Sequence, residues 1–365
     1  MLTALELQRY QRHLSLAGFG AAAQERLKAG HVLVIGAGGL GCPALIYLAA
    51  AGVGRITVVD ADRVDPSNLQ RQTLYSEADV GDLKVEAACR HLRAQNSLLT
   101  VVGVTDRFRR DNALDLVRAS DVVIDGSDNF ATRYLVNDAC VMSDRPFVYG
   151  AIQGFDGQLS VFNWRGGPTY RCLFPTPPTS ELAPNCANAG VLGILPGIVG
   201  TWQAGEAIKL LTGVGQPLSG RLLLWNALTM STQLVALAQD PRSRPIVELP
   251  ADEEADICAS SQWEVDAAEL RRILDRGRVQ LIDVREDWER AAEAIDPSTH
   301  IPLPLLEQSD DEQILAGLRP EAPTVVYCAA GVRSLRAVAI LRARYGFLSV
   351  TSLRGGMHGW THLCR

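Results

Sequence analysis

One cysteine stands where a thiolate would be reactive. Cys328 follows the apolar run 324–327 and precedes a segment with helical spacing, and the loop that it opens reads Cys-Ala-Ala-Gly-Val-Arg and ends at Arg333. The free N–H groups and the positive dipole end of a helix favour an anion, and Arg333 adds a fixed positive charge. We therefore expect Cys328 to carry chemistry, although a free cysteine is more commonly a buried packing residue.

A second group of residues is typical of a nucleotide site. Gly36, Gly38, Gly39 and Gly41 lie between an apolar strand and a helix, and Asp60 ends the next strand. Glycines at such a turn let phosphates approach the helix N-terminus, and the carboxylate accepts hydrogen bonds from ribose hydroxyls. Taken alone this pair indicates NAD, and the glycine turn alone also occurs as a strand–helix contact without any ligand.

The polar residues further along the chain favour phosphate chemistry over hydride transfer. Two cations, Arg71 and Lys84, and neighbouring amides follow Asp60, and Asp128 lies just after the fourth expected strand, where strand ends meet ligands. Phosphoryl chemistry needs cations on the phosphates and a carboxylate for magnesium. Either cation alone would be interpreted as a solvated surface charge. Together, the two cations and the carboxylate predict a site for a nucleoside triphosphate.

The elements that position these residues are those of two α/β units. Strand-like runs alternate with helical patterns from residue 31 to about 150, which predicts a mostly parallel sheet. Runs at 158–162, 222–225 and 229–237 look antiparallel, with a helix over 201–211. We expect a Rossmann-like mixed sheet with one parallel and one antiparallel half over residues 1–240, a proline-broken linker over 241–262, and a smaller α/β domain over 263–365 that begins with the capping box Asp266-x-x-Glu269.

Composition narrows the class of protein. The chain has 365 residues, a formal net charge of −6 and no long basic cluster, which argues against nucleic acid as a partner. No uncharged apolar run reaches about 18 residues, so no membrane role is expected. The eight cysteines show no disulfide framework, which is typical of free thiols in the cytoplasm.

Over residues 1 to about 240 the chain resembles the MoeB/ThiF family, bacterial relatives of ubiquitin-activating enzymes. Six motifs in order carry the resemblance: Arg9-Tyr10-x-Arg12, Gly36 to Gly41, Asp60-x-Asp62, Asn68-Leu69-Gln70-Arg71-Gln72, Gly81-x-x-Lys84-Val85-Glu86 and Asp125-x-x-Asp128-Asn129. The resemblance implies that ATP adenylates the C-terminal glycine of a ubiquitin-like sulfur carrier that ends in Gly-Gly.

The resemblance also implies roles for individual residues. Glycines of the turn line the nucleotide, Asp60 holds the ribose, and Asp128 serves Mg²⁺. Arg12 would reach into the site of a partner subunit, which implies a homodimer. The nucleotide-binding set that we expect is Gly36, Gly38, Gly39, Gly41, Asp60, Asp62, Asn68, Arg71, Gln72, Lys84, Asp128, Asn129 and Arg12.

Residues 263–365 resemble a rhodanese domain. The resemblance rests on Leu281 to Glu286, on His300-Ile301-Pro302-Leu303, on the six-residue loop from Cys328 to Arg333, and on the closing segment Leu353 to Trp360. It implies that Cys328 carries a persulfide. Ala329 and Ala330 stand where basic or polar residues are common, and this leaves the sulfur donor open between a cysteine desulfurase and thiosulfate.

Two further cysteines, Cys186 and Cys172, stand at positions where members of the MoeB/ThiF family often have a cysteine. Cys186 lies in a loop where the family often has a cysteine that is proposed to bind the carrier covalently, and a bystander thiol is an equal alternative. Many members hold zinc through two Cys-x-x-Cys pairs. Here Cys172 remains, but Pro175 takes its partner's place and 239–245 holds no cysteine, so we expect no zinc site.

The sequence thus predicts an adenylyltransferase joined to a sulfurtransferase. Cys328 would pass persulfide sulfur to the adenylated carrier to give a thiocarboxylate, for a molybdopterin, thiamine, cysteine or tRNA-thiolation pathway. Two alternatives stay open: an adenylating enzyme whose rhodanese domain is only a binding module, and a nucleotide-sensing scaffold without turnover. The residues expected to take part in the chemistry are Cys328, Cys186, Arg71, Asp128 and Arg333.

Overall fold

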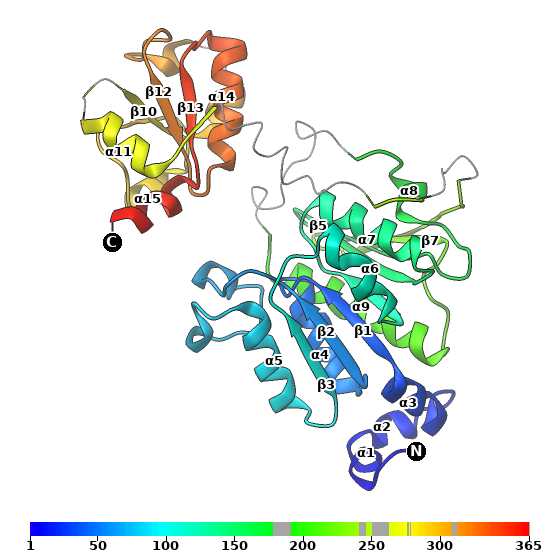
Figure 1. Cartoon of the computed structure of the whole chain (residues 1–365). Coiled ribbons are helices and arrows are strands. Elements are labelled where there is room, and N and C mark those ends of the chain that lie inside the picture. Colours follow the sequence, from blue (N-terminus) through cyan, green and yellow to red (C-terminus); the bar gives the residue numbers. More distant parts are fainter. Residues whose placement is uncertain are drawn as a thin grey trace. The chain divides into compact units, whose positions relative to one another are not determined.

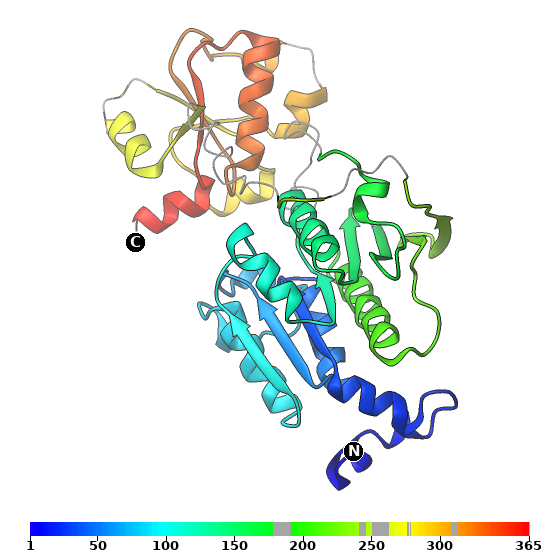
Figure 2. The ribbon, with the colours of Figure 1, turned by 45° about the vertical axis from the view of Figure 1, so that its right-hand side comes forward.

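The computed structural model describes residues 1–177, 191–240, 246–249, 263–275, 277, 279–308 and 312–364. The chain divides into two compact units, residues 1–252 and 253–365. Figures 1 and 2 show each unit as a sheet covered by helices. Within the described part of the chain, no helix combines the length and the apolar character that spanning a bilayer requires.

The N-terminal unit is built on one eight-stranded mixed sheet of order β3-β2-β1-β4-β5-β6-β7-β8. The strands from β3 to β5 pair in parallel, and β5 to β8 pair antiparallel. This is the predicted combination of a parallel and an antiparallel half. The bounds are β1 (His31–Ile35), β2 (Arg55–Val59), β3 (Thr100–Val104), β4 (Val122–Asp125), β5 (Phe147–Gln153), β6 (Asp156–Phe162), β7 (Arg221–Asn226) and β8 (Ser231–Ala236).

Helices cover both faces of this sheet because its central strands are apolar on both sides. In β1, Val32 and Val34 belong to one core and Leu33 and Ile35 to the other. The first core includes residues of α3 (Gly20–Ala29), α4 (Gly41–Ala51), α5 (Lys84–Gln95) and α9 (Ile194–Thr212). The second includes residues of α6 (Arg110–Arg118) and α7 (Phe130–Met142), which Figure 1 shows side by side. Outside these layers lie α1 (Ala4–Arg9), α2 (Gln11–Leu14), α8 (Tyr170–Leu173), and the 3₁₀ turns η1 (Pro66–Asn68) and η2 (Glu77–Asp79).

The helix predicted over 201–211 is longer than the sequence pattern indicated. It begins at Ile194, seven residues earlier, and ends at Gly213 in the left-handed conformation as expected. Pro196 lies in its first turn, where a missing N–H costs nothing because no carbonyl precedes it in the helix. The proline and the glycines near it have low helix propensity, so the sequence pattern did not predict a helix in this part of the chain.

The strand order reverses between β1 and β4, and this point positions the candidate nucleotide site. β1 lies between β2 and β4. From β1 the chain adds β2 and β3 on one side, and it then adds β4 and β5 on the other side. Ligands of open α/β sheets bind at such a point, beyond the carboxyl ends of the strands. The glycine turn after β1, Asp60 after β2 and Asp128 after β4 all leave the sheet at this edge.

The C-terminal unit is a five-stranded parallel sheet of order β11-β10-β12-β13-β9. Its strands are β9 (Glu264–Val265), β10 (Gln280–Asp283), β11 (Thr299–His300), β12 (Thr324–Tyr327) and β13 (Val350–Leu353). One core packs it against α14 (Val332–Tyr345) and α13 (Leu303–Gln308), and the other against α11 (Ala267–Asp275) and α15 (Gly356–Cys364). Two shorter elements, α12 (Asp287–Ala292) and η4 (Glu312–Leu315), complete it. Asp266 accepts a hydrogen bond from the Glu269 N–H at 2.7 Å, so it caps α11 as predicted.

Candidate functional site

The glycine turn after β1 has no room for a Cβ atom at two of its positions. A Cβ at Gly41 would lie 1.9 Å from the carbonyl oxygen of Gly36, and one at Gly36 would lie 2.7 Å from the carbonyl oxygen of Gly126. By contrast, a Cβ at Gly38 would meet only the Gln72 amide nitrogen at 3.8 Å. The turn is therefore closely packed at its ends and open at Gly38, where a phosphate can approach the N-terminus of α4.

Both backbone polar groups of Ala37 in this turn are fixed by hydrogen bonds. Its N–H donates to Asp60 Oδ2 at 2.7 Å, and its carbonyl accepts from the Tyr75 hydroxyl at 2.9 Å and from Cys42 Sγ at 3.3 Å. Burial raises the pKa of Cys42 to about 12 and raises that of Tyr75, so both remain neutral donors. Tyr75 could not be selected from the sequence, because no local motif connects it with a turn 38 residues away.

Two carboxylates and a lysine lie beside this turn. Asp60 Oδ1 accepts a hydrogen bond from the Asp62 N–H at 2.8 Å, and burial raises the pKa of Asp60. Asp62 Oδ2 lies 2.9 Å from Lys84 Nζ. The lysine side chain is 8% exposed whereas that of Asp62 is 67% exposed, so Asp62 is the partner that solvent or a ligand can displace. Lys84 is thus a buried cation at the first residue of α5, held beside the glycine turn.

The segment from Asn68 to Gln72 brings an unpaired acceptor to the same turn. Gln72 is 3% exposed, and its Oε1 atom is buried without a hydrogen-bond partner. Such an atom is costly in a folded protein unless a ligand or a water satisfies it. Arg71 donates to the Ser67 carbonyl at 2.9 Å, and its Cγ would be 3.6 Å from a Cβ at Gly39. Asn68 ends η1 and contacts Ser67 and Asp65.

The loop that carries Asp128 rests on a buried ion pair that the sequence analysis did not select. Asp125 is fully buried, and its Oδ1 accepts from the Ser127 N–H at 3.0 Å and from the Ser127 hydroxyl at 2.5 Å. Its Oδ2 lies 3.2 Å from Arg133 Nε, and Arg133 also donates to the Ser127 carbonyl at 3.2 Å and lies over the Tyr149 ring. Burial, the largest single influence, would lower the pKa of Arg133, but Asp125 together with Tyr149 and Tyr170 outweighs it and the pKa is raised.

This pair leaves Asp128 free to point outward. Asp128 is exposed, and the described structure gives its carboxylate one weak contact, the Asn129 side-chain amide at 3.4 Å. Asn129 is the N-cap of α7, since its Oδ1 accepts from the Thr132 N–H at 2.8 Å, and its role in nucleotide binding stays a prediction. An exposed carboxylate at a strand end, beside the candidate phosphate site, fits Mg²⁺, which takes one or two carboxylates along with substrate phosphates.

Two predicted residues stand apart from this constellation. Arg12 is exposed on α2, and among the described residues it makes no hydrogen bond or ion pair. Cys186 falls within 178–190, outside the described residues, so its expected role stays a prediction.

In the C-terminal unit, the structure places Cys328 between β12 and the first turn of α14, as expected. The side chain is 1% exposed, and its Sγ lies 3.1 Å from the Gly331 N–H and 3.4 Å from the Ser334 hydroxyl. Gly331 has a φ of +96°, a conformation that favours glycine and that turns its N–H toward the sulfur. The sulfur therefore accepts a hydrogen bond from the Gly331 N–H, a contact that favours a thiolate or persulfide, while the neighbouring Ser334 hydroxyl donates to the Gly331 carbonyl at 2.8 Å.

Arg333 has a partner that the sequence analysis did not identify. Its Nη1 and Nη2 lie 2.7 and 2.6 Å from the two carboxylate oxygens of Glu289 on α12. Hydrogen bonding to Glu289 raises the pKa of Arg333. Burial would raise the pKa of Glu289, but its bonds from Arg333 and from the Glu286 N–H outweigh this and lower it. No local signal predicts this pair, because 44 residues separate its members.

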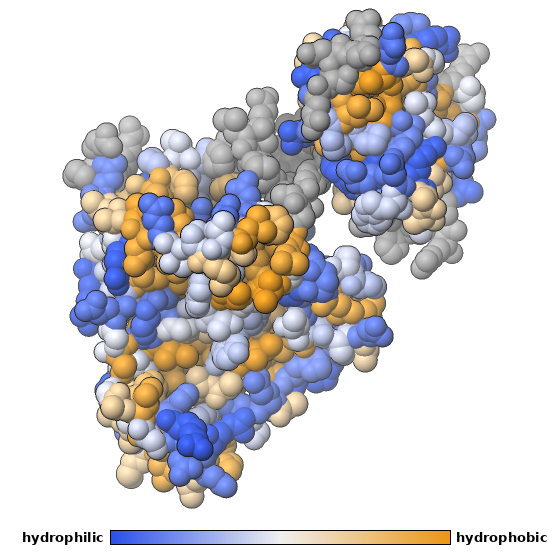
Figure 3. Space-filling view, turned by 180° about the vertical axis from the view of Figure 1, so that it is seen from behind, coloured by the Kyte–Doolittle hydropathy of each residue, from blue (hydrophilic) through white to orange (hydrophobic). Residues whose placement is uncertain are grey.

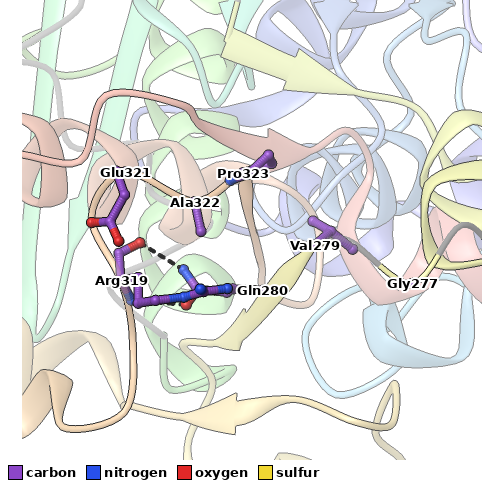
Figure 4. A pocket seen from close by; sticks show the side chains of 7 residues that line it. All are labelled: Gly277, Val279, Gln280, Arg319, Glu321, Ala322 and Pro323. Atoms are coloured by element: carbon purple, nitrogen blue, oxygen red, sulfur yellow. Dashed lines mark hydrogen bonds between the residues drawn. The ribbon is translucent and has the colours of Figure 1, made fainter.

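The remaining chemistry-bearing groups lie elsewhere. Cys172 on α8 contacts Thr169, and the described residues contain no group of three or more His, Cys, Asp or Glu side chains that could hold a metal ion. A hollow of about 430 Å³, shown in Figure 4, is lined by residues at the start of β10 and before β12, the opposite end of the strand from Cys328: Gly277, Val279, Gln280, Arg319, Glu321, Ala322 and Pro323. Because of this position, the hollow is not part of the Cys328 site.

Comparison with known proteins identifies both units. Residues 10–245 match the ThiF family, and residues 266–363 match the rhodanese-like domain. The chain belongs to the ThiF family. It is 44% identical to the "probable adenylyltransferase/sulfurtransferase MoeZ" of Mycobacterium tuberculosis, over 98% of this chain and 94% of that protein. It is 49% identical to the "sulfur carrier protein adenylyltransferase" of Thermus thermophilus, over 69% of this chain and 95% of that protein.

Solved structures agree with the fold of the N-terminal unit. The crystal structure of E. coli MccB with ATP covers 64% of this chain with a TM-score of 0.56 and 22% identity, and this chain covers 73% of it. The ThiF-family chain thus joins, in one polypeptide, the adenylyltransferase and the sulfurtransferase domains that its relatives of nearly full length are named for.

Proposed function

We propose that the ThiF domain uses ATP to adenylate the C-terminal glycine of a ubiquitin-like sulfur carrier, and that Cys328 then supplies the sulfur for a thiocarboxylate. The observation that carries the proposal is that one chain holds both an open glycine turn beside a buried lysine and a cysteine whose sulfur accepts a hydrogen bond from the Gly331 N–H. The names of the relatives agree with it, since they combine the same two activities and one of them names a sulfur carrier protein.

In the first step the carrier's carboxylate attacks the α-phosphorus of ATP and pyrophosphate leaves. Gly38 provides the space for phosphate, and Lys84 supplies a positive charge to it when Asp62 is displaced. The unpaired Gln72 oxygen would accept a hydrogen bond from the nucleotide, and Asp60 has further acceptor capacity for the ribose. Arg71, one residue from Gln72, would bind phosphate once it releases the Ser67 carbonyl.

Asp128 would hold Mg²⁺, which neutralises phosphate charge during pyrophosphate release. Arg12 would complete the site of a second copy, because it is exposed and lacks a partner in the described structure. A homodimer also has surface to bury: large apolar side chains such as Leu192 and Ile194 are more than half exposed, and Figure 3 shows apolar side chains gathered on one face of the N-terminal unit. We place this activity in the cytoplasm, where thiols without a disulfide framework stay reduced.

In the second step the Cys328 persulfide attacks the carbonyl carbon of the carrier adenylate and AMP leaves. The acyl disulfide that forms is then cleaved by a second thiol, which releases the thiocarboxylate and leaves a disulfide on Cys328. Cys186 is one candidate for a covalent step with the carrier, and direct attack of the persulfide without it is the other.

ATP–pyrophosphate exchange in the presence of a candidate carrier tests the first step, and mass spectrometry of the carrier C-terminus tests the second. Exchange that depends on the carrier, followed by a gain of one sulfur in place of one oxygen, supports the proposal. Exchange without sulfur gain in the presence of a loaded Cys328 would favour the alternative in which the rhodanese domain only binds. Absence of exchange with every Gly-Gly carrier tested would favour a nucleotide-sensing scaffold.

A further inference from the structure

We propose that Glu289 determines which sulfur donor loads Cys328: by neutralising Arg333 it disfavours thiosulfate and leaves a site suited to a persulfide of low charge. This inference rests on the proposed function of Cys328 as a persulfide carrier. It is carried by the bidentate pair between Glu289 and Arg333 and by the absence of any other charge in the loop.

The loop itself offers an anionic donor very little. From Cys328 to Arg333 the only charged residue is Arg333, and positions 329 and 330 are alanines. The groups that contact the sulfur are neutral: the Gly331 N–H, which donates to it, and the Ser334 hydroxyl at 3.4 Å, which donates to the Gly331 carbonyl. Such groups stabilise one negative charge on sulfur, whereas thiosulfate brings two charges of its own before any bond changes.

The cations around the loop are already paired. Both carboxylate oxygens of Glu289 bind Arg333, and the side chains are 11% and 21% exposed, respectively. Arg285, which donates to the Glu289 carbonyl, is itself bound to Asp283 at 2.8 and 2.9 Å. A bidentate pair that is largely shielded from water has strong directional bonds and no net charge.

Binding of thiosulfate would have to break that arrangement. If Arg333 turned to the anion, the Glu289 carboxylate would be left largely buried and without its cation close to a dianion, which is costly. A persulfide avoids this penalty because its reacting S–SH group carries at most one charge, whereas thiosulfate carries two. In that reaction the Cys328 thiolate attacks the outer sulfur of R–S–SH, the donor S–S bond breaks, and R–S⁻ leaves. With thiosulfate the same attack breaks its S–S bond and releases sulfite.

The test compares sulfur loading of Cys328, by intact-protein mass spectrometry, from thiosulfate and from a cysteine hydropersulfide whose amino and carboxyl groups are blocked. Glu289→Gln keeps the size of the side chain but frees the charge of Arg333. We expect it to raise the thiosulfate-to-persulfide rate ratio at least about tenfold, the gain from one new charge-assisted contact. Asp287→Asn is the matched control, since it removes one carboxylate from the same helix at a side chain that is 94% exposed and does not bind Arg333. It should leave the ratio unchanged.

A second variant protects the test if Glu289→Gln does not fold. Ala330 is exposed, so Ala330→Lys adds a cation to the loop while the pair stays intact, and it should raise the same ratio. An equal gain with Asp287→Asn would show that only net charge matters, and an unchanged ratio in both Ala330→Lys and a folded Glu289→Gln would overturn the proposal. Failure of both donors to load wild-type Cys328 would instead contradict the proposed function.

Discussion

The two candidate sites differ in how ready they are to receive a ligand. The nucleotide site is open at Gly38, has an unpaired acceptor at Gln72, and is held in shape by buried residues behind it. The sulfur site is closed: Cys328 is almost fully buried, and the one cation of its loop is bound to Glu289. A site for a diffusing nucleotide can be preformed, whereas a persulfide benefits from protection until its acceptor arrives. We therefore expect the loop around Cys328 to expose the sulfur when its acceptor binds.

The buried pair behind the nucleotide site gives the largest expected effect on stability. Arg133→Met leaves Asp125 buried and without its cation, which should cost about 3–5 kcal/mol of unfolding free energy for the N-terminal unit. Urea unfolding of the full chain measures it. The double variant Arg133→Met/Asp125→Asn should recover much of the loss, because the uncompensated charge is then gone. A single variant as stable as wild type would show that the pair does not hold the site.

Removal of a charge that faces the ligand should affect catalysis and spare the fold. Lys84→Ala and Asp128→Ala should each lower pyrophosphate exchange by about 2–4 kcal/mol of transition-state stabilisation. Arg63→Ala is the control, since Arg63 is an exposed cation nearby that binds only the Gly81 carbonyl in the described structure. Exchange within a few-fold of wild type for either charge variant would remove that residue from the site.

The openness of the glycine turn predicts a smaller effect at Gly38. A Cβ there meets no protein atom closer than 3.8 Å, so Gly38→Ala should fold normally and weaken ATP binding by about 1–3 kcal/mol, because the methyl group takes space meant for phosphate. Isothermal titration with a non-hydrolysable ATP analogue provides the measurement. Unaltered affinity would place the phosphates elsewhere.

Two measurements test the metal requirements of this chain: the dependence of pyrophosphate exchange on Mg²⁺ and the zinc content of the purified protein. Chelation of Mg²⁺ should stop pyrophosphate exchange, whereas Cys172→Ser should change neither zinc content nor stability appreciably, because a single cysteine cannot hold tetrahedral zinc. Elemental analysis of the purified protein decides the second point. About one zinc per chain would mean that ligands from 178–190, from 241–245, from the remaining undescribed residues or from a second copy complete a site.

The sequence predicts best what local pattern determines. The predicted alternation of strands and helices from residue 31 to about 150 is confirmed, since the apolar runs that form β1, β2 and β3 and the turns that follow them are local features. The start of α9 was missed because Pro196 interrupts the pattern without interrupting the helix. The glycines, Asp60 and Lys84 could be selected from motifs, but Tyr75, Arg133 and Glu289 could not. Each acts through a contact that only the folded chain creates, and Glu289 lies 44 residues from Arg333.

The central claim is that activation and sulfur transfer are carried out at two separate sites, one in each domain. The direct test is a single turnover of the Cys328→Ala protein with ATP, a Gly-Gly carrier and a persulfide donor, followed by mass spectrometry of the carrier. We expect adenylated carrier at the wild-type rate and no thiocarboxylate. Formation of thiocarboxylate by Cys328→Ala at the wild-type rate would contradict the account.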